Sequence, residues 1–437
     1  MYTETDSCRL CSSADLIDLV DLGMLALTGV FPRSLDEEVP CGPLALVRCI
    51  KCGLVQLKHN YELTSLYGET YGYRSGLNQS MVDHLQSKVR QIEQMVNLAP
   101  GDCVVDIGSN DGTLLNSYRI PGLTRIGIDP TGAKFHEFYD PDVELIPEFF
   151  SARAIKSRTS KKARAVTSIA MFYDLEDPLN FVEQILEILA DDGIWVLEQS
   201  YLPLMVEANA YDTICHEHLE YYTLEQILYI TDKLDLKIVA LETNATNGGS
   251  FSLAIARRKS PYKEAREEVR RLLEKEVSAG YRGLEPFERL RNSMESHRDA
   301  LGQFLHECKR NGDLVLGYGA STKGNVLLQY CGVSRDLLPC IGEVNPDKYG
   351  AFTPGTKIPI VPEADVRAKR PEYLLVLPWH FRRGIVQKEA RYLEGGGGLV
   401  FPLPKLEVVT AAGALSGVEQ LGQTAQAGAD AGVLPQG

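Results

Sequence analysis

The stretch that decides the fold is CVVDIGSNDGTLL, residues 103–115. An apolar run ends at Asp106, a glycine-rich turn follows, and a helix is predicted to begin near Thr113. This order is typical of the first βαβ unit of a parallel sheet, which brings a ligand to the carboxyl edge of the strands. The pattern D-x-G-x-N-D-G lacks the third glycine of the dinucleotide fingerprint G-x-G-x-x-G, which argues against NAD or FAD.

Three further strand edges follow, in LTRIGID (123–129), AVTSIAMFYDLEDP (165–178) and GIWVLEQSYL (193–202). An acid at the first of these edges can accept hydrogen bonds from both ribose hydroxyls of a nucleoside, and the two residues after the next strand can face adenine. The series resembles the class I methyltransferases that use S-adenosylmethionine (SAM), whose first motif matches residues 103–115. The resemblance implies SAM as cofactor, held by Asp106, Gly108, Asn110, Asp111, Gly112, Asp129, Met171 and Phe172.

Two cysteine pairs precede this region, CRLC at 8–11 and CIKC at 49–52. Each C-x-x-C can place two thiolates on one metal, and two pairs complete a tetrahedral zinc site. The alternatives are unrelated cysteines or a redox pair. Because four sulfur ligands leave no open position, we expect a structural zinc ion held by Cys8, Cys11, Cys49 and Cys52.

Composition excludes several classes of protein. The 45 Lys and Arg and 59 Asp and Glu give a net charge of −14 without a dense basic run, which argues against nucleic acid as a partner. No apolar run is long enough to cross a membrane, and the N-terminus lacks the apolar region of a signal peptide. Ten cysteines without such a signal indicate a cytoplasmic enzyme rather than a disulfide framework. The oligomeric state stays open, and a monomer is compatible with the sequence.

The pattern of strands and helices predicts an α/β protein with two separate parallel sheets. The expected parts are a small N-terminal zinc-binding domain, a central SAM-binding Rossmann-like domain, a helical connector, a second Rossmann-like domain and a disordered tail. Their expected bounds are 1–75, 76–258, 259–311, 312–408 and 409–437.

The unusual stretch DTICHEHLEYYT, residues 212–223, follows the fourth strand edge, where such methyltransferases place their substrate. Its histidines do not have the H-E-x-x-H spacing of a zinc protease. Four interpretations stay open: a metal site, Cys215 as a nucleophile, histidines with a structural role, or a histidine as general base. We favour the base, because a neutral imidazole removes protons near pH 7.

Five features occur in a fixed order along the chain: the cysteine pairs, YGYRSGLNQSM (71–81), the first motif, the E-H before a tyrosine pair, and GYGASTKGN (317–325). In this they resemble the zinc-containing sugar C-methyltransferases of deoxysugar pathways, over nearly all of the chain except its tail. The resemblance implies that C3 of a nucleotide-linked 4-keto-6-deoxy sugar is deprotonated and then methylated by SAM. The implied catalytic residues are His218, Glu217, Tyr222 and Tyr71, with Tyr73 at the cofactor.

The chain departs from this family at two places. Cys215 stands where family members carry a tyrosine, and SIAMFYDLED (168–177) replaces a motif that usually holds Asn and His. A thiol has neither the reach nor the acidity of a phenol at that position. The departures leave open which carbon and which sugar are used.

The second alternating block opens with DLVLGYGASTKGNVLLQY, residues 313–330. Amides at a helix N-terminus suit phosphate, although the string is not a P-loop. By the resemblance, this domain holds the nucleotide of the sugar substrate, which is TDP, GDP or CDP. The candidate substrate-binding residues are Lys323, Lys348, Tyr349, Trp379, His380 and Arg382.

Three alternative functions remain at this point. A SAM-dependent O- or N-methyltransferase on a nucleotide sugar would use the same domains on a different acceptor atom. An NAD-dependent nucleotide-sugar oxidoreductase or epimerase would need the dinucleotide fingerprint that is broken here. A non-catalytic zinc- and nucleotide-binding protein would bind the same ligands without turnover.

Overall fold

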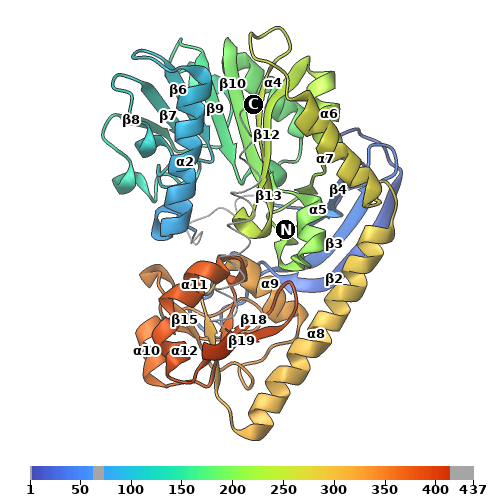
Figure 1. Ribbon diagram of the computed structural model, residues 1–437, viewed down its shortest axis with the longest axis vertical. Coiled ribbons are helices and arrows are strands. Elements are labelled where there is room, and N and C mark those ends of the chain that lie inside the picture. Colours follow the sequence, from blue (N-terminus) through green and yellow to red (C-terminus); the bar gives the residue numbers. More distant parts are fainter. Residues whose placement is uncertain (1, 63–72, 414–437) are drawn as a thin grey trace, which may run out of the picture. The chain divides into compact units, whose positions relative to one another are not determined.

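The structure is a computed structural model that describes residues 2–62 and 73–413 (Figure 1). Tyr71 and the part of the predicted tail from residue 414 lie outside the described residues. The chain divides into two compact units. The first unit is Met1–Phe31 with Glu38–Ser293, and the second is Pro32–Glu37 with Met294–Gly437.

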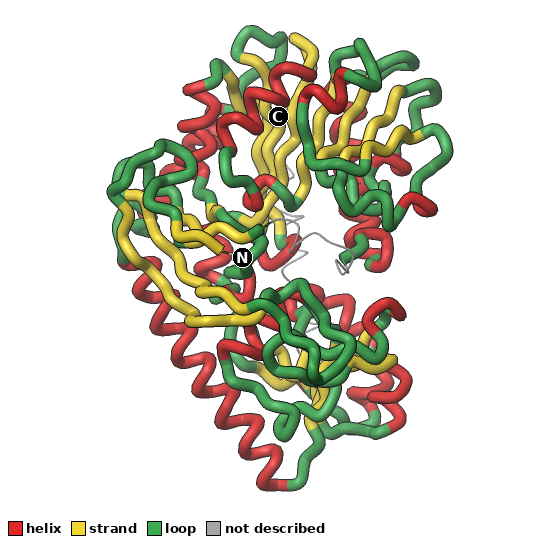
Figure 2. Tube along the Cα trace, turned by 180° about the vertical axis from the view of Figure 1, so that it is seen from behind, coloured by secondary structure: helices red, strands yellow, loops and turns green. Residues whose placement is uncertain are grey.

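The N-terminal part of the first unit is an antiparallel sheet in the order β11-β4-β3-β2. These strands are β2 (Leu16–Ala26), β3 (Cys41–Cys49), β4 (Val55–Leu57) and β11 (Glu220–Tyr221), and the long β2 and β3 run side by side in Figure 2. A two-stranded ribbon joins β1 (Tyr2–Glu4) to β5 (His59–Tyr61). The short β11 comes from the segment that contains the two histidines, so distant parts of the sequence share this sheet.

The centre of the first unit is a seven-stranded sheet in the order β12-β13-β10-β9-β6-β7-β8. β8, β7, β6, β9 and β10 pair in parallel, and β13 and β12 continue the sheet antiparallel. Their bounds are β6 (Cys103–Ile107), β7 (Thr124–Ile128), β8 (Val143–Ile146), β9 (Ala163–Ile169), β10 (Leu189–Ser200), β12 (Leu236–Asn244) and β13 (Ser250–Arg257). Every residue of β6 is buried, as expected where helices cover both faces of parallel strands.

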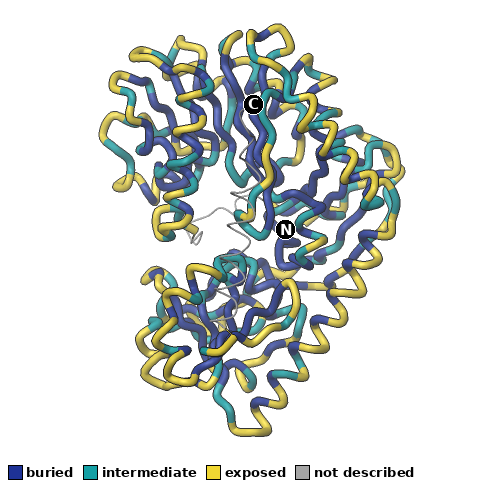
Figure 3. The backbone as a smooth tube through the Cα atoms, in the orientation of Figure 1, coloured by how far each residue is buried: buried dark blue, intermediate teal, exposed yellow. Residues whose placement is uncertain are grey.

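Helices cover both faces of this sheet, and Figure 3 shows the buried strands between more exposed helices and loops. The apolar stripe of α2 (Gln79–Val96) packs on one face, and its N-terminus is capped by Asn78. The other face is covered by α3 (Ala152–Lys156), α4 (Pro178–Ile188), α6 (Leu224–Lys233) and α7 (Arg266–Ser278). The short α5 (Leu202–Glu207) follows β10. α8 (Glu285–Asn311) contains the boundary between the two units.

The second unit is a doubly wound sheet in the order β16-β15-β14-β17-β18-β19. All its pairs are parallel except that of β18 with β19. Its strands are β14 (Val315–Tyr318), β15 (Ile341–Glu343), β16 (Ile360–Pro362), β17 (Tyr373–Val376), β18 (Gly398–Phe401) and β19 (Glu407–Val409). Its helices after α8 are α9 (Thr322–Tyr330), α10 (Glu363–Ala368), α11 (Arg382–Lys388) and α12 (Ala390–Glu394).

The predicted fold class is confirmed, since two doubly wound α/β sheets follow a small cysteine-bearing sheet. In the described ranges, no helix combines the length and apolar character that a membrane crossing requires.

Candidate active site and zinc centre

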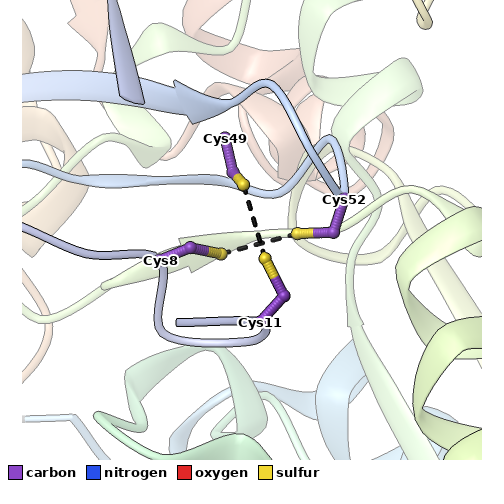
Figure 4. Close-up of side chains that lie close together, drawn as sticks. All are labelled: Cys8, Cys11, Cys49 and Cys52. Atoms are coloured by element: carbon purple, nitrogen blue, oxygen red, sulfur yellow. Dashed lines mark hydrogen bonds between the residues drawn. The ribbon is translucent and has the colours of Figure 1, made fainter. Parts of the chain in front are cut away.

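The four cysteines of the two pairs converge on one point, although they come from two separate turns (Figure 4). Their Sγ atoms all lie within 4.8 Å of one another, with Cys8 and Cys52 3.4 Å apart and Cys11 and Cys49 3.5 Å apart. Tetrahedral zinc with Zn–S bonds of about 2.3 Å needs sulfurs about 3.8 Å apart, so this donor set fits zinc. Cys41 begins β3 at the end opposite Cys49 and is exposed, so it does not belong to the site.

The glycine turn after β6 depends on backbone conformations that favour glycine and asparagine. The φ angles of Gly108, Asn110 and Gly112 are 74°, 51° and 76°. A Cβ atom on Gly112 would lie 2.8 Å from the Tyr139 ring, so only glycine fits there without displacing the ring. The Tyr139 hydroxyl donates a hydrogen bond to the Asn110 carbonyl at 2.8 Å. These contacts therefore fix the conformation of the turn at the carboxyl edge of the sheet.

Asp129, at the end of β7, is 7% exposed and already accepts three hydrogen bonds. Asn110 N–H donates to Oδ2 at 2.8 Å, and the Thr131 N–H and hydroxyl both donate to Oδ1 at 2.6 Å. A carboxylate has about four acceptor positions. Protein donors take three of these positions, and one acceptor position of Asp129 remains for a ligand.

Asp106 lies one strand away, at the end of β6, and is 4% exposed. The Thr167 hydroxyl donates to Asp106 Oδ1 at 2.5 Å. Burial raises the pKa of Asp106 to about 7. This carboxyl group is therefore partly protonated near neutral pH.

Asn110 and Asp111 hold the segment that begins with Tyr73. The Asn110 carboxamide donates to the Tyr73 carbonyl at 3.1 Å and accepts from Ser75 N–H at 2.9 Å. Asp111 accepts from Gly76 N–H at 2.8 Å. Tyr73 is 48% exposed, and these hydrogen bonds hold the residues that follow it in the chain against the glycine turn. The two polar side chains of the motif thus position the tyrosine segment beside the cofactor turn.

Met171 and Phe172 have different surroundings. The Met171 side chain lies next to Gly108, where an added Cβ would be 3.1 Å from its Cγ. Phe172 has no exposed surface, and its ring packs 5.4 Å from Trp195 and 5.4 Å from Tyr222. The structure therefore places Met171 beside the glycine turn and Phe172 in the core, against Trp195 and Tyr222.

His218 is held in one tautomer by the backbone. Its Nδ1 lies 2.8 Å from the carbonyl oxygen of Thr213, so Nδ1 carries the proton and donates, and the lone pair lies on Nε2. The Tyr173 ring is 4.2 Å from the imidazole, centroid to centroid, and is 7% exposed. Tyr173 belongs to the 3-10 turn Phe172–Asp174 after β9. The ring orientation of His218 is thus fixed from two sides.

The other two residues of the H-E-H stretch are buried. His216 donates from Nε2 to the Gly42 carbonyl at 3.4 Å, packs edge-on against Tyr61, and burial lowers its pKa to about 4. This neutral histidine has a structural role. The Glu217 carboxyl group accepts a hydrogen bond from the Thr28 hydroxyl at 3.2 Å and contacts the Cys215 thiol, and burial raises the pKa of Glu217.

The two tyrosines after His218 point to different partners. The Tyr221 hydroxyl is 3.5 Å from the Thr213 carbonyl, which is the acceptor that His218 also uses. The Tyr222 hydroxyl donates to Glu220 Oε2 at 2.5 Å, and Tyr222 has no exposed surface. The structure therefore brings Tyr221, rather than the predicted Tyr222, to the support of the histidine.

Hydrogen bonds join the histidine segment to the zinc-binding part. β11 pairs with β4, and Leu57 N–H donates to the Leu219 carbonyl at 2.8 Å. The Gln226 carboxamide donates to the carbonyl of the zinc-site residue Cys52 at 2.9 Å. The backbone on which His218 lies is therefore continuous with the sheet that carries the thiols.

In the second unit, several predicted substrate residues already have protein partners. Lys348 Nζ donates to the Ala320 carbonyl at 2.8 Å, and the Tyr349 hydroxyl donates to the Val344 carbonyl at 3.2 Å. The Arg382 guanidinium pairs with Glu407 at 2.7 Å. These side chains brace the loops at the carboxyl edge of the sheet.

His380 and Trp379 follow β17 in a 3-10 turn, with Trp379 8% exposed. Burial and the nearby charge of Lys323 lower the pKa of His380 to about 3. His380 is therefore neutral near pH 7 and offers a ring rather than a cation. Lys323 lies in the first turn of α9 and supplies the positive charge near His380.

Sequence reasoning missed Glu343, the last residue of β15. Its carboxyl group accepts from Ala320 N–H at 2.8 Å and from Asn345 N–H at 2.9 Å, which ties the turn after β14 to the loop after β15. The sequence signal that could have identified Glu343 is an acidic residue at the end of the second strand of a Rossmann-like domain. Tyr173 and Thr28 were also missed, because their contacts join segments far apart in the sequence.

Comparison with known proteins gives the same order of domains. The chain matches family models for a zinc binding domain (residues 8–67), a methyltransferase domain (82–241) and a C-methyltransferase C-terminal domain (245–404). It is 30% identical to the C-methyltransferase NovU of Streptomyces niveus, over 93% of this chain and 97% of that protein.

Two solved structures are similar to a smaller part of the chain. The plantazolicin methyltransferase BpumL, solved with SAH, is 14% identical, with a TM-score of 0.32 over 40% of this chain and 82% of that one. An O-methyltransferase family protein from Burkholderia thailandensis is 17% identical, with a TM-score of 0.32 over 42% and 59%. From its domain order and its identity with NovU along nearly the whole chain, the protein belongs to the C-methyltransferase family and is a SAM-dependent C-methyltransferase with a structural zinc site.

Proposed function

We propose that the protein methylates C3 of a nucleotide-linked 4-keto-6-deoxy sugar, with His218 as the general base. The observation that carries this proposal is the 2.8 Å hydrogen bond from His218 Nδ1 to the Thr213 carbonyl. Because this bond places the lone pair of His218 on Nε2, the imidazole is prepared to accept a proton. SAM, when bound, supplies an electrophilic methyl group.

The proton that Nε2 accepts comes from the carbon next to the ketone. The electron pair of that C–H bond moves into an enolate, and the same carbon then forms the new bond to the methyl group. The imidazolium that results is stabilised by its hydrogen bond to the Thr213 carbonyl, which the Tyr221 hydroxyl also approaches. Tyr173 packs on the ring and limits its rotation, so that Nε2 keeps one direction during proton transfer.

We assign the binding of SAM to the carboxyl edge of β6 and β7. The open glycine turn, Met171 beside Gly108 and the remaining acceptor position of Asp129 suit the amino-acid, adenosine and ribose portions of SAM. Asn110 and Asp111 contribute by holding the Tyr73 segment next to the turn.

We assign the nucleotide of the substrate to the carboxyl edge of β14, β15 and β17 in the second unit. Lys323 supplies positive charge for a diphosphate, and Trp379 and His380 supply ring surfaces for a base. The bonded network of Glu343, Ala320 and Lys348 keeps the turn after β14 in place. In this proposal, Lys348, Tyr349 and Arg382 contribute by stabilising the loops at this edge through their hydrogen bonds and ion pair.

The test is a methyl-transfer assay read by mass spectrometry. The protein is incubated with SAM and TDP-, GDP- or CDP-linked 4-keto-6-deoxy sugars, in ordinary and in heavy water. We expect a product heavier by one CH2 group, with the methyl on C3 by NMR, and deuterium exchange at C3 when SAM is replaced by SAH. A methyl group on oxygen or nitrogen would refute the proposal.

A further inference from the structure

Gln199 is a buried amide that the fold leaves without hydrogen bonds. Its side chain is 1% exposed, near the carboxyl end of β10. Among the described residues, neither Nε2 nor Oε1 of Gln199 has a hydrogen-bond partner, and both atoms are shielded from solvent. Buried side-chain amides are nearly always satisfied in native proteins, by a protein group, an ordered water or a ligand.

Two other buried glutamines of the same unit have both polar atoms of their amides hydrogen-bonded within the protein. Gln56 accepts from Arg9 N–H at 2.9 Å and donates to the Ser7 carbonyl at 3.1 Å. Gln226 accepts from Thr223 N–H at 2.9 Å and donates to the Cys52 carbonyl at 2.9 Å. Both of these amides are buried as completely as Gln199. Gln199 therefore differs from its two counterparts in its partners and not in its burial.

The position of Gln199 links it to the candidate active site. Next to it in the chain, the Glu198 carbonyl accepts from Ala170 N–H at 2.7 Å, and Ala170 leads into the turn that carries Tyr173. Three residues after it, Leu202 N–H donates to the carbonyl of Tyr222 at 3.0 Å, at the end of the His218 segment. The backbone around Gln199 is thus bonded to both segments that meet at the His218 ring.

The alternation of side chains along β10 gives the direction of Gln199. Glu198 points to the α2 face, where it pairs with Lys88 at 2.9 Å. Gln199 therefore points to the opposite face, with Leu197 and the buried Phe172. Its ladder partner on β13 is Phe251, which is also fully buried. The residues that surround the amide on this face therefore include the apolar Leu197, Phe172 and Phe251.

We propose that Gln199 binds the sugar of the substrate, with Nε2 donating to the ketone oxygen and Oε1 accepting from a neighbouring hydroxyl. This inference rests on the proposed function and adds a residue to it. A ketone beside a hydroxyl presents one acceptor and one donor on adjacent carbons, which a carboxamide can satisfy together. As the enolate forms, negative charge grows on the ketone oxygen, and a fixed N–H donor stabilises it without adding a charge to the site.

The test compares Gln199→Leu with Gln226→Leu, two equivalent changes at buried amides. Thermal unfolding is measured on zinc-loaded protein without substrate. Because Gln199 has no protein partner to lose, we expect Gln199→Leu to keep or raise the melting temperature. Gln226→Leu should lower it, since two partners are left unsatisfied. A loss of stability in Gln199→Leu equal to that in Gln226→Leu would overturn the inference.

The second measurement is methyl transfer to the sugar on which the wild type is active. Removal of one donor to a developing oxyanion lowers kcat by about 10²–10³-fold, and we expect a loss of this size in Gln199→Leu with the Kd for SAM unchanged. Exchange of the substrate C3 hydrogen with solvent should fall in parallel. Unchanged kcat/KM in Gln199→Leu would overturn only the inference, because the wild type still makes the product. A wild type that gives no product with any of the keto sugars would overturn the proposed function and the inference together.

Discussion

Replacement of Asp106 by Asn should change how the stability of the protein depends on pH. Burial raises the pKa of this carboxyl group from 3.8 to about 7 in the folded chain. A raised folded-state pKa means that the stabilising contribution is complete below about pH 4 and is lost as the pH rises through 7. Asn keeps an oxygen that can accept from the Thr167 hydroxyl but does not ionise, so Asp106→Asn should not show this loss.

The magnitude follows from the difference between about 7 and 3.8, which is roughly 3 pKa units. At about 1.4 kcal/mol per unit, the full effect is about 4 kcal/mol, and about 2 kcal/mol of it falls between pH 5.5 and 8.5. Over that interval we expect the free energy of unfolding of Asp106→Asn to rise by about 2 kcal/mol relative to the wild type.

The assay is urea unfolding followed by circular dichroism, on zinc-loaded protein without SAM, at several pH values from 5.5 to 8.5. Asp129→Asn is the matched control at the next strand end. Because Asp129 accepts three protein hydrogen bonds, its replacement should lower stability at every pH in the series. Wild-type and Asp106→Asn curves that stay parallel across the range would refute the reasoning.

Three further predictions concern the cofactor wall, the base and the metal. Phe172→Ala should lower the free energy of unfolding by about 3–5 kcal/mol, because the ring is fully buried, whereas Met171→Ala, at a half-buried side chain, should lower it less and raise the Kd for SAM in calorimetry. His218→Ala should reduce kcat by about 10²–10⁴-fold without changing the Kd for SAM, and full activity in this variant would exclude His218 as the base. Cys8→Ser should lose zinc, measured by elemental mass spectrometry, and lower the melting temperature, and zinc-free protein with unchanged melting would contradict a structural ion.

The features that could be predicted from the sequence are local in the chain. Each C-x-x-C fixes two thiols within one turn, and the structure brings the two pairs within 4.8 Å. The turn from Gly108 to Gly112 was also visible, because its backbone conformations favour the residue types found there. In both cases a few neighbouring residues determine the geometry.

What could not be predicted depends on contacts between distant segments. Phe172 and Met171 are neighbours with similar polarity, and only the presence of Trp195 and Tyr222 decides which of them is buried. The state of the Gln199 amide depends likewise on which groups from other segments surround it among the described residues. No sequence pattern records such an arrangement.

The pairing of β11 with β4 has a consequence for how this protein can be recombined with its relatives. Because β11 supplies the outer strand of the zinc-side sheet, residues 2–62 and residues 217–222 form one structural block interrupted in the sequence. A chimera that exchanged the N-terminal segment alone would give β4 a foreign neighbour or leave it as an unpaired edge. Exchange of both segments together would keep that pairing, and substitutions in one should be inherited with compensating substitutions in the other.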